Sequence, residues 1–184
     1  MCVIDYNDEI LKLKHVEFYK PPKKGDVFER LQEVRQYIFA VTSSWNPDAV
    51  ALEDIVLFMG GRSTARTITT LTALNRTVGL AVLDNTGKSP HLYNVMKIRH
   101  QIKEGKKAPK KEDVPERVAK ILEIDLEAAS KGEHNFPYIM NKRNKVAKEN
   151  EDMADAIAVA LCHIFIERAP KKKPRKKRVL KKKE

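Results

Sequence analysis

The fold class follows from one stretch, Pro47-Asp48-Ala49-Val50-Ala51-Leu52-Glu53, together with the segment before it. Its four consecutive apolar residues do not alternate with polar ones, which is typical of a short strand that is buried on both faces. In the preceding segment, Asp26 suits the cap of a helix, and apolar residues recur at helical spacing as far as Phe39. A helix, a Pro-Asp turn and a doubly buried strand in this order predict an α/β sheet.

Segments on both sides extend this prediction. Residues 1–20 alternate apolar and polar side chains around a tight turn at 7–9, which predicts two paired strands. A long helix is predicted over 62–83, although its many threonines are poor helix formers, and a further short strand over 91–95. The sheet is therefore expected to have helices to pack against as well as several strands.

The second half of the chain is less regular. Residues 97–111 are basic and are expected to be mobile, a short helix is expected to start at Asp113, and residues 125–148 are expected to be irregular. The last ordered element is a helix that Asn150 is expected to cap and that is apolar on most sides as far as Phe165. Such a helix is buried on most of its surface.

Length and composition indicate a single domain. The chain has 184 residues, of which 42% are hydrophobic, so we expect one folded domain over 1–168 and a tail over 169–184. No apolar run approaches the length of a membrane span, and the start lacks the features of a signal peptide. Cys2 and Cys162 form no spaced pattern, which excludes a disulfide scaffold or a cysteine zinc site and suits a reducing cytoplasm.

Most of the net charge of +11 lies in the tail. Between Lys171 and Glu184 there are ten Lys or Arg residues and one acid, so this segment carries +9 and the rest of the chain +2. The segment has no apolar periodicity, which predicts a disordered arm. Such an arm suits a polyanion, of which nucleic acid is the commonest, and the alternative is a tail that only improves solubility.

Two aspartates open the nearly apolar last helix. Asp152 and Asp155 are three residues apart, so they lie one turn from each other on the same face and repel. The positive end of the helix dipole is an alternative explanation for Asp152, but it explains Asp155 less well. A divalent cation would account for both aspartates, because hard oxygen ligands share its charge.

Glu53 adds a third carboxylate. It ends the buried strand, and active sites of α/β sheets lie beyond the carboxyl ends of strands. Together with Asp152 and Asp155 it could converge on a metal cluster, in which two ions about 4 Å apart activate water for phosphodiester hydrolysis. A solvated acid at a strand end is the alternative for Glu53.

Four features of the chain occur in the same order in a known family. They are the strand at 47–53, the long helix over 62–79, the basic segment with Lys97 and Lys111-Glu112-Asp113-Val114, and the acidic helix Glu151-Asp152-Met153-Ala154-Asp155-Ala156-Ile157-Ala158-Val159-Ala160. On these motifs the chain resembles the RuvC-type Holliday-junction resolvases of the ribonuclease-H-like superfamily, especially their phage-encoded branch, and the resemblance covers roughly residues 1–168. The acidic helix is the most specific of the four.

The resemblance implies a ribonuclease-H-like mixed sheet flanked by helices. It implies a Mg²⁺-dependent endonuclease, with Mn²⁺ able to replace Mg²⁺, that resolves four-way and related branched DNA in recombination and repair. Glu53, Asp152 and Asp155 would be catalytic metal ligands, and Lys97 and Lys111 would stabilise charge on the phosphate. A homodimer is also implied, because two symmetric nicks need two active sites, and a phage-encoded member would act in the host cytoplasm.

The start of the chain departs from the family's pattern. The family opens with a strand that carries the first catalytic aspartate, whereas residues 1–5 resemble its second strand. Asp5 is a candidate for the absent ligand, but the tight turn that follows does not match the family's longer connection. We therefore expect that the chain as given starts late and lacks the first strand, one metal ligand and much of its cleavage activity.

Basic residues are dense in the middle of the chain. Residues 97–111 hold seven positive charges against Glu104 alone, enough for several phosphate contacts, and the alternative is a solvated surface loop. Phe58 could stack on an unpaired base or could belong to the core. The residues expected to contact DNA are Phe58, Lys97, Arg99, Lys103, Lys106, Lys107, Lys110, Lys111, Lys142, Arg143 and Lys145.

Two other function classes stay open. One is a non-catalytic branched-DNA-binding protein that has lost its first metal-ligand aspartate. The other is a ribonuclease-H-like enzyme that acts on RNA–DNA hybrids or processes RNA. If the leading interpretation is right, binding follows the shape of the junction and not the 2′-hydroxyl content of the strands.

Overall fold

The computed structural model describes residues 1–7, 10–21, 24–55, 64–131, 136 and 148–169. Phe58, the basic residues at 142–145 and the tail lie outside these described residues. The described elements are, in chain order, β1 (Cys2–Tyr6), β2 (Leu11–Val16), α1 (Val27–Trp45), β3 (Ala51–Glu53), α2 (Ala65–Thr86), β4 (His91–Tyr93), α3 (Val95–Gln101), the 3₁₀-helix η1 (Lys111–Asp113), α4 (Val114–Ile121), α5 (Leu126–Ser130) and α6 (Lys148–Arg168).

The described strands form two separate two-stranded sheets. β1 pairs antiparallel with β2, and β3 pairs parallel with β4, so that Ala51 lies opposite His91 and Glu53 opposite Tyr93. α6 lies against both β1 and β3 and therefore spans the two sheets. The α/β class, the paired N-terminal strands and a strand ending at Glu53 are thus confirmed. The expected burial of that strand on both faces is not, because Ala51 and Leu52 are only half-buried and Glu53 is exposed.

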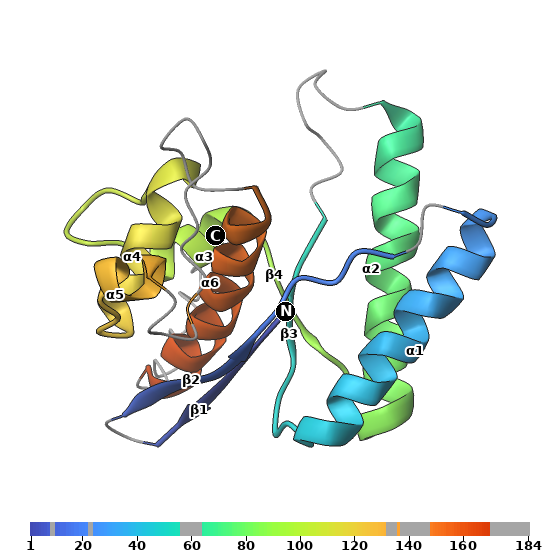
Figure 1. Ribbon diagram of the computed structural model, residues 1–184, viewed down its shortest axis with the longest axis horizontal. Coiled ribbons are helices and arrows are strands. Elements are labelled where there is room, and N and C mark those ends of the chain that lie inside the picture. The colour runs from blue at the N-terminus through green and yellow to red at the C-terminus, as the bar shows by residue number, and fades with distance from the viewer. Residues whose placement is uncertain (8–9, 22–23, 56–63, 132–135, 137–147, 170–184) are drawn as a thin grey trace, which may run out of the picture.

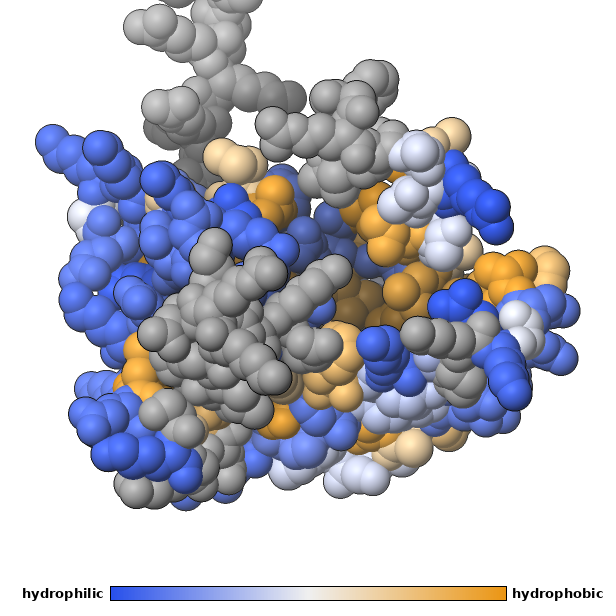
Figure 2. All heavy atoms as spheres, turned by 45° about the horizontal axis from the view of Figure 1, so that its top comes forward, coloured by the Kyte–Doolittle hydropathy of each residue, from blue (hydrophilic) through white to orange (hydrophobic). Residues whose placement is uncertain are grey.

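Helices lie on both sides of β3 (Figure 1). α1 and α2 pack against each other on one side, and α6 lies on the other side with α3, α4 and α5. The main cluster of buried side chains belongs to the α6 side and includes Ile102, Val118, Phe136, Ile157 and Leu161. Hydrophobic side chains remain visible on the surface toward α1 and α2, whereas the side of α3, α4 and α5 is mostly hydrophilic (Figure 2).

Local signals explain where the two long helices beside β3 begin and end. The Asp26 carboxylate accepts hydrogen bonds from two amides of the first turn of α1, and Glu29 accepts one from the Asp26 amide at 2.8 Å. This reciprocal capping box is what the residue types predict. α2 begins after a Thr64 cap and ends at Gly87, whose φ of 69° is in the left-handed region that favours glycine.

Three local expectations are wrong. Residues 97–111, expected to be mobile, include most of α3 and the first residue of η1. Asn94 caps α3, and the buried residues Ile98 and Ile102 attach it to the core. Asn150 does not cap the last helix but is buried inside it, since α6 starts at Lys148. α5 interrupts the segment 125–148, which was expected to be irregular.

None of the helices in the described ranges combines the length and the apolar character that crossing a bilayer requires.

Candidate active site

Two acids from distant parts of the chain meet where β3 ends and α6 begins. Glu53 is the last residue of β3, and Asp155 lies in the second turn of α6, which packs on that strand. Burial raises the pKa of Glu53, and the negative charge of Asp155 raises it further. Burial also raises the pKa of Asp155, and the charges of Asp152 and Glu151 add to this effect. The fold thus holds like charges close together in a partly enclosed place.

Two cations face these acids. Lys111 stands on η1 with its Nζ 3.7 Å from Glu151 Oε2. The charges of Lys111 and of Arg99, on α3, oppose the rise in pKa of both Glu53 and Asp155. The acids and cations therefore form one cluster of alternating charge, built from β3, α3, η1 and α6.

Lys97 takes a different position from Arg99, although both are on α3. Its Nζ lies 4.9 Å from the centre of the Tyr93 ring, a cation–π contact. Residues two apart on a helix do not face the same way, so Lys97 and Arg99 cannot both point at the acids from one face. The sequence analysis proposed Lys97 as a catalytic cation and Arg99 only as a DNA contact. In the structure it is the charge of Arg99 that opposes the rise in pKa of Glu53 and Asp155.

Asp152 is exposed at the start of α6, close to the beginning of the chain. Burial lowers the pKa of the Met1 ammonium, and the charge of Asp152 partly offsets this. The same ammonium donates a hydrogen bond to the Glu17 carbonyl at 2.7 Å. Asp5, the alternative candidate for a first ligand, is an exposed acid whose carboxylate lies 3.9 Å from Lys14 Nζ on β2.

The donor set fits a hard divalent cation in part. Within the described ranges, no group of three or more His, Cys, Asp or Glu side chains is arranged to hold a metal ion. Glu53 and Asp155 do offer carboxylate oxygens, the donors that Mg²⁺ prefers, and their mutual repulsion is what a bound cation would relieve. They suit two positions of a larger ligand set, and the assignment of Glu53, Asp152 and Asp155 as joint metal ligands stays a prediction.

Asn75 supports the site and was missed by the sequence analysis. From α2, its Nδ2 donates a hydrogen bond to the Glu53 carbonyl at 2.8 Å, which ties this helix to the end of β3. Its Oδ1 is buried and has no hydrogen-bond partner among the described residues. The only signal in the sequence was an amide side chain inside a helix, where such residues are poor helix formers.

Of the basic residues predicted to contact DNA, the remaining ones that the structure describes lie in one connection. Lys106, Lys107 and Lys110 are exposed and Lys103 is half-buried, all between α3 and η1. Lys142, Arg143 and Lys145 lie outside the described residues, so their predicted DNA contacts stay predictions. The same is true of Phe58.

Comparison with known proteins bears on the fold. Protein-family models give no match to this chain, and neither do curated protein sequences. Among solved structures, Thermus thermophilus RuvC in complex with a Holliday junction substrate is similar with a TM-score of 0.65 and 19% identity, over 91% of this chain and 86% of that chain. A second Thermus thermophilus RuvC structure is similar with a TM-score of 0.63 and 21% identity, over the same shares of the two chains. The chain therefore has a RuvC-like fold.

Proposed function

We propose that this chain is a Mg²⁺-dependent nuclease that recognises four-way and related branched DNA. The observation that carries the proposal is the pair of acids, Glu53 and Asp155, facing Lys111 and Arg99 at the end of β3. Acids suit a metal ion, and adjacent cations suit a phosphate that the metal ion also contacts. The similar RuvC structure with a Holliday junction supports the substrate class, and two symmetric nicks would require a homodimer.

Each residue of the cluster has a role in this proposal. Glu53 and Asp155, with Asp152 beside them, would hold Mg²⁺, which when bound activates water and stabilises the leaving oxygen. Lys111 and Arg99 would bind and orient the scissile phosphate and stabilise the negative charge that develops on it. Asn75 would keep Glu53 in place through its backbone.

We also propose that one more strand belongs between β1 and β3. α6 lies against both, while β2 and β4 pair with one edge of each, and no described strand pairs with the other edge. A strand parallel to β3 and antiparallel to β1 would join the two sheets and give α1 and α2 a larger surface to cover. An aspartate on that strand, level with Glu53, would complete the ligand set.

A non-catalytic branched-DNA-binding protein is the second candidate function. It is favoured by one observation: within the described ranges no three acids or other ligands are arranged to hold a metal. The two candidates share the same basic residues and therefore the same binding properties. They differ only in whether the bound junction is cut.

The test compares binding and cleavage in the same samples. The 184-residue chain should bind a four-way junction more tightly than a duplex of equal length and should nick it slowly in Mg²⁺. Asp155→Asn should remove this nicking while binding persists. Equal affinity for junction and duplex would contradict the proposed substrate class. Full-rate nicking by the chain, unchanged by Asp5→Asn, would contradict the proposed extra strand.

Lys111→Met tests the cation assigned to the phosphate. This variant should lower the rate of junction cleavage more than it lowers affinity for the junction, because the charge acts on the transition state. Lys131→Met is the matched control. Lys131 is an exposed lysine at the C-cap of α5, and its Nζ pairs with Glu127 of the same helix at 2.8 Å. Equal effects of both substitutions on the cleavage rate would argue against a role for Lys111.

A further inference from the structure

Three of the lysines predicted to contact DNA belong to a single turn, which we call the lysine turn (residues 103–107). Glu104 and Lys107 pair across it, and Gly105 has a φ of 65°, in the left-handed region that favours glycine. The turn and α4 border a cleft of about 340 Å³, and Lys106 and Lys107 are exposed. Burial in the core therefore does not account for how the lysine turn is held.

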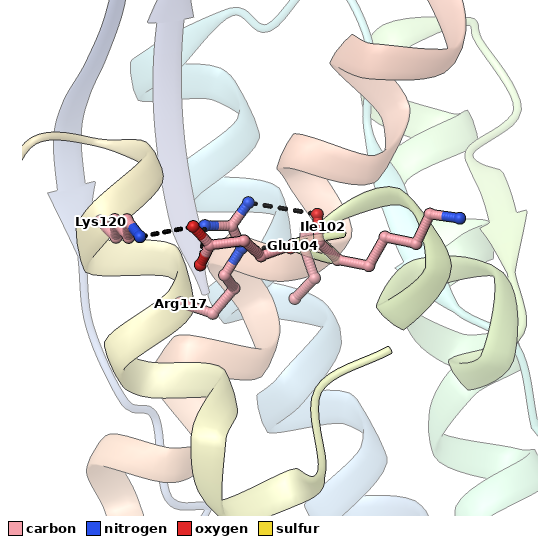
Figure 3. Close-up of polar contacts among 5 residues, drawn as sticks. Ile102, Glu104, Arg117 and Lys120 are labelled. Carbon is pink, nitrogen blue, oxygen red and sulfur yellow. Dashed lines mark hydrogen bonds and ion pairs between the residues drawn. The ribbon is translucent and has the colours of Figure 1, made fainter. Parts of the chain in front are cut away.

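Arg117, on α4, holds the base of the lysine turn. It donates hydrogen bonds from Nε to the Ile102 carbonyl at 2.5 Å and from Nη2 to the Lys103 carbonyl at 3.2 Å (Figure 3). Ile102 is the C-cap of α3 and is fully buried, so this end of the turn is attached to the core. The planar guanidinium presents its donors in a fixed fork, which suits two neighbouring carbonyls in a way that a lysine cannot match.

Glu104 joins the lysine turn to α4 at a second point. Its Oε1 lies 2.6 Å from Lys120 Nζ, and its Oε2 lies 3.3 Å from Arg117 Nη1 (Figure 3). The hydrogen bond and charge of Lys120 lower the pKa of Glu104, and Arg117 contributes in the same direction. A single exposed ion pair is weak, but here one carboxylate binds two cations, one of which also binds the backbone of the turn.

We propose that Glu104 and Arg117 are positioning residues that hold Lys103, Lys106 and Lys107 ready to bind the phosphates of a nucleic acid. The inference rests on the proposed DNA-binding function and adds that an acid strengthens binding to a polyanion. A loose turn must lose conformational freedom when its lysines bind, whereas a turn that is already held has little to lose. Simple electrostatics predicts the opposite sign, because removing an acid should favour binding to DNA.

The test compares Glu104→Ala with Glu112→Ala in the full chain. Glu112 is an exposed acid on η1 that takes part in none of the ion pairs of the described residues. Each variant therefore removes one negative charge from the same stretch of the chain, residues 103–112. Binding to a fluorescent four-way junction is measured at several salt concentrations. Glu104→Ala should weaken binding about threefold to tenfold and lower the salt slope by about one, as ordering cost rises and a phosphate contact is lost. Glu112→Ala should leave affinity unchanged or raise it.

A second variant separates geometry from charge. Arg117→Lys keeps the positive charge but loses the fork, so it should also weaken junction binding and should speed amide hydrogen exchange at residues 103–107 of the free protein. Tighter binding by Glu104→Ala, or equal changes in both acid variants, would overturn the inference. If the unaltered chain binds neither junction nor duplex, the proposed function fails and this inference with it. If the unaltered chain binds and only the variants behave in the wrong order, the inference alone fails.

Discussion

Replacing Asp155 with asparagine should stabilise the metal-free protein, although it removes a carboxylate that we assign to catalysis. Burial disfavours the charged form of Asp155. Asp155 interacts electrostatically with five charged neighbours. Three of them are acids and two are cations: Glu53, Asp152, Glu151, Lys111 and Arg99. At neutral pH, folding therefore places a negative charge where its neighbours do not fully compensate it.

The size of the effect follows from this charge balance. Among the neighbours of Asp155, the acids exceed the cations by one. One uncompensated like charge at the spacing of neighbours on a helix surface lowers stability by about 0.2–1 kcal/mol. Partial burial of the carboxylate adds to that cost. We expect Asp155→Asn to raise the free energy of unfolding at pH 7 by about 1 kcal/mol, which in a chain of this size raises Tm by about 2–4 °C.

The gain should depend on pH in one direction. Because the pKa of Asp155 is raised in the folded protein, the folded state keeps its proton to higher pH than the unfolded chain does. The protein therefore loses stability as the pH rises through this raised pKa, and asparagine avoids the loss. Below the ordinary value of 3.8 the carboxyl is protonated in both states, so the advantage of asparagine disappears.

Thermal unfolding in EDTA measures the change in stability caused by Asp155→Asn. Repeating it at neutral pH and below the ordinary pKa of aspartate gives both the size of the change and the direction of its pH dependence. Asp5→Asn is the matched control: it makes the same substitution at a carboxylate that is 68% exposed and paired with Lys14, and it should leave Tm nearly unchanged. A lower Tm for Asp155→Asn at pH 7 would mean that Lys111 and Arg99 fully pair Asp155. The argument for an uncompensated acid cluster would then be wrong.

Three further predictions concern the tail, a helix cap and the core. Deleting Lys171–Glu184 should weaken binding to junction and duplex alike and lower the salt slope, because an arm of lysines contacts phosphates and reads no bases; anisotropy titrations showing a loss for the junction alone would contradict this. Asp26→Ala should lower the free energy of unfolding by about 1 kcal/mol in urea titrations, since its carboxylate caps two amides of α1. Leu161→Ala should cost about 2–5 kcal/mol in the same assay, because this side chain is fully buried, whereas Leu80→Ala, at a side chain left 58% exposed, should cost much less.

Elements with strong local signals could be predicted from the sequence. The Asp26 cap, the apolar run before Glu53 and the alternation in residues 1–20 each reflect an interaction between residues that are close in the chain. The meeting of Glu53 with the acidic helix could also be anticipated. It depends only on the rule that functional side chains gather at the carboxyl ends of parallel strands.

Features that depend on tertiary contacts could not be predicted in the same way. α3 is only seven residues long and strongly basic, so its charges concealed the helical spacing of the buried Ile98 and Ile102. Because α3 was not predicted, the sequence did not indicate that Lys97 and Arg99 lie on different faces of a helix. Arg117 was overlooked because its partners are mainly backbone carbonyls, which leave no trace in the residue types.

The strand edges of β1 and β3 that no described strand covers also affect how the protein should be handled. Such edges present rows of N–H and C=O groups that can pair with an extended segment of any other chain, and so promote aggregation. The +9 charge of the tail opposes this, because copies of the protein repel one another at low ionic strength. Salt screens that repulsion, because the Debye length falls to about 3 Å at an ionic strength of 1 M. A concentrated-salt wash, the usual way to strip nucleic acid from a basic protein, would therefore remove the repulsion that keeps these edges apart.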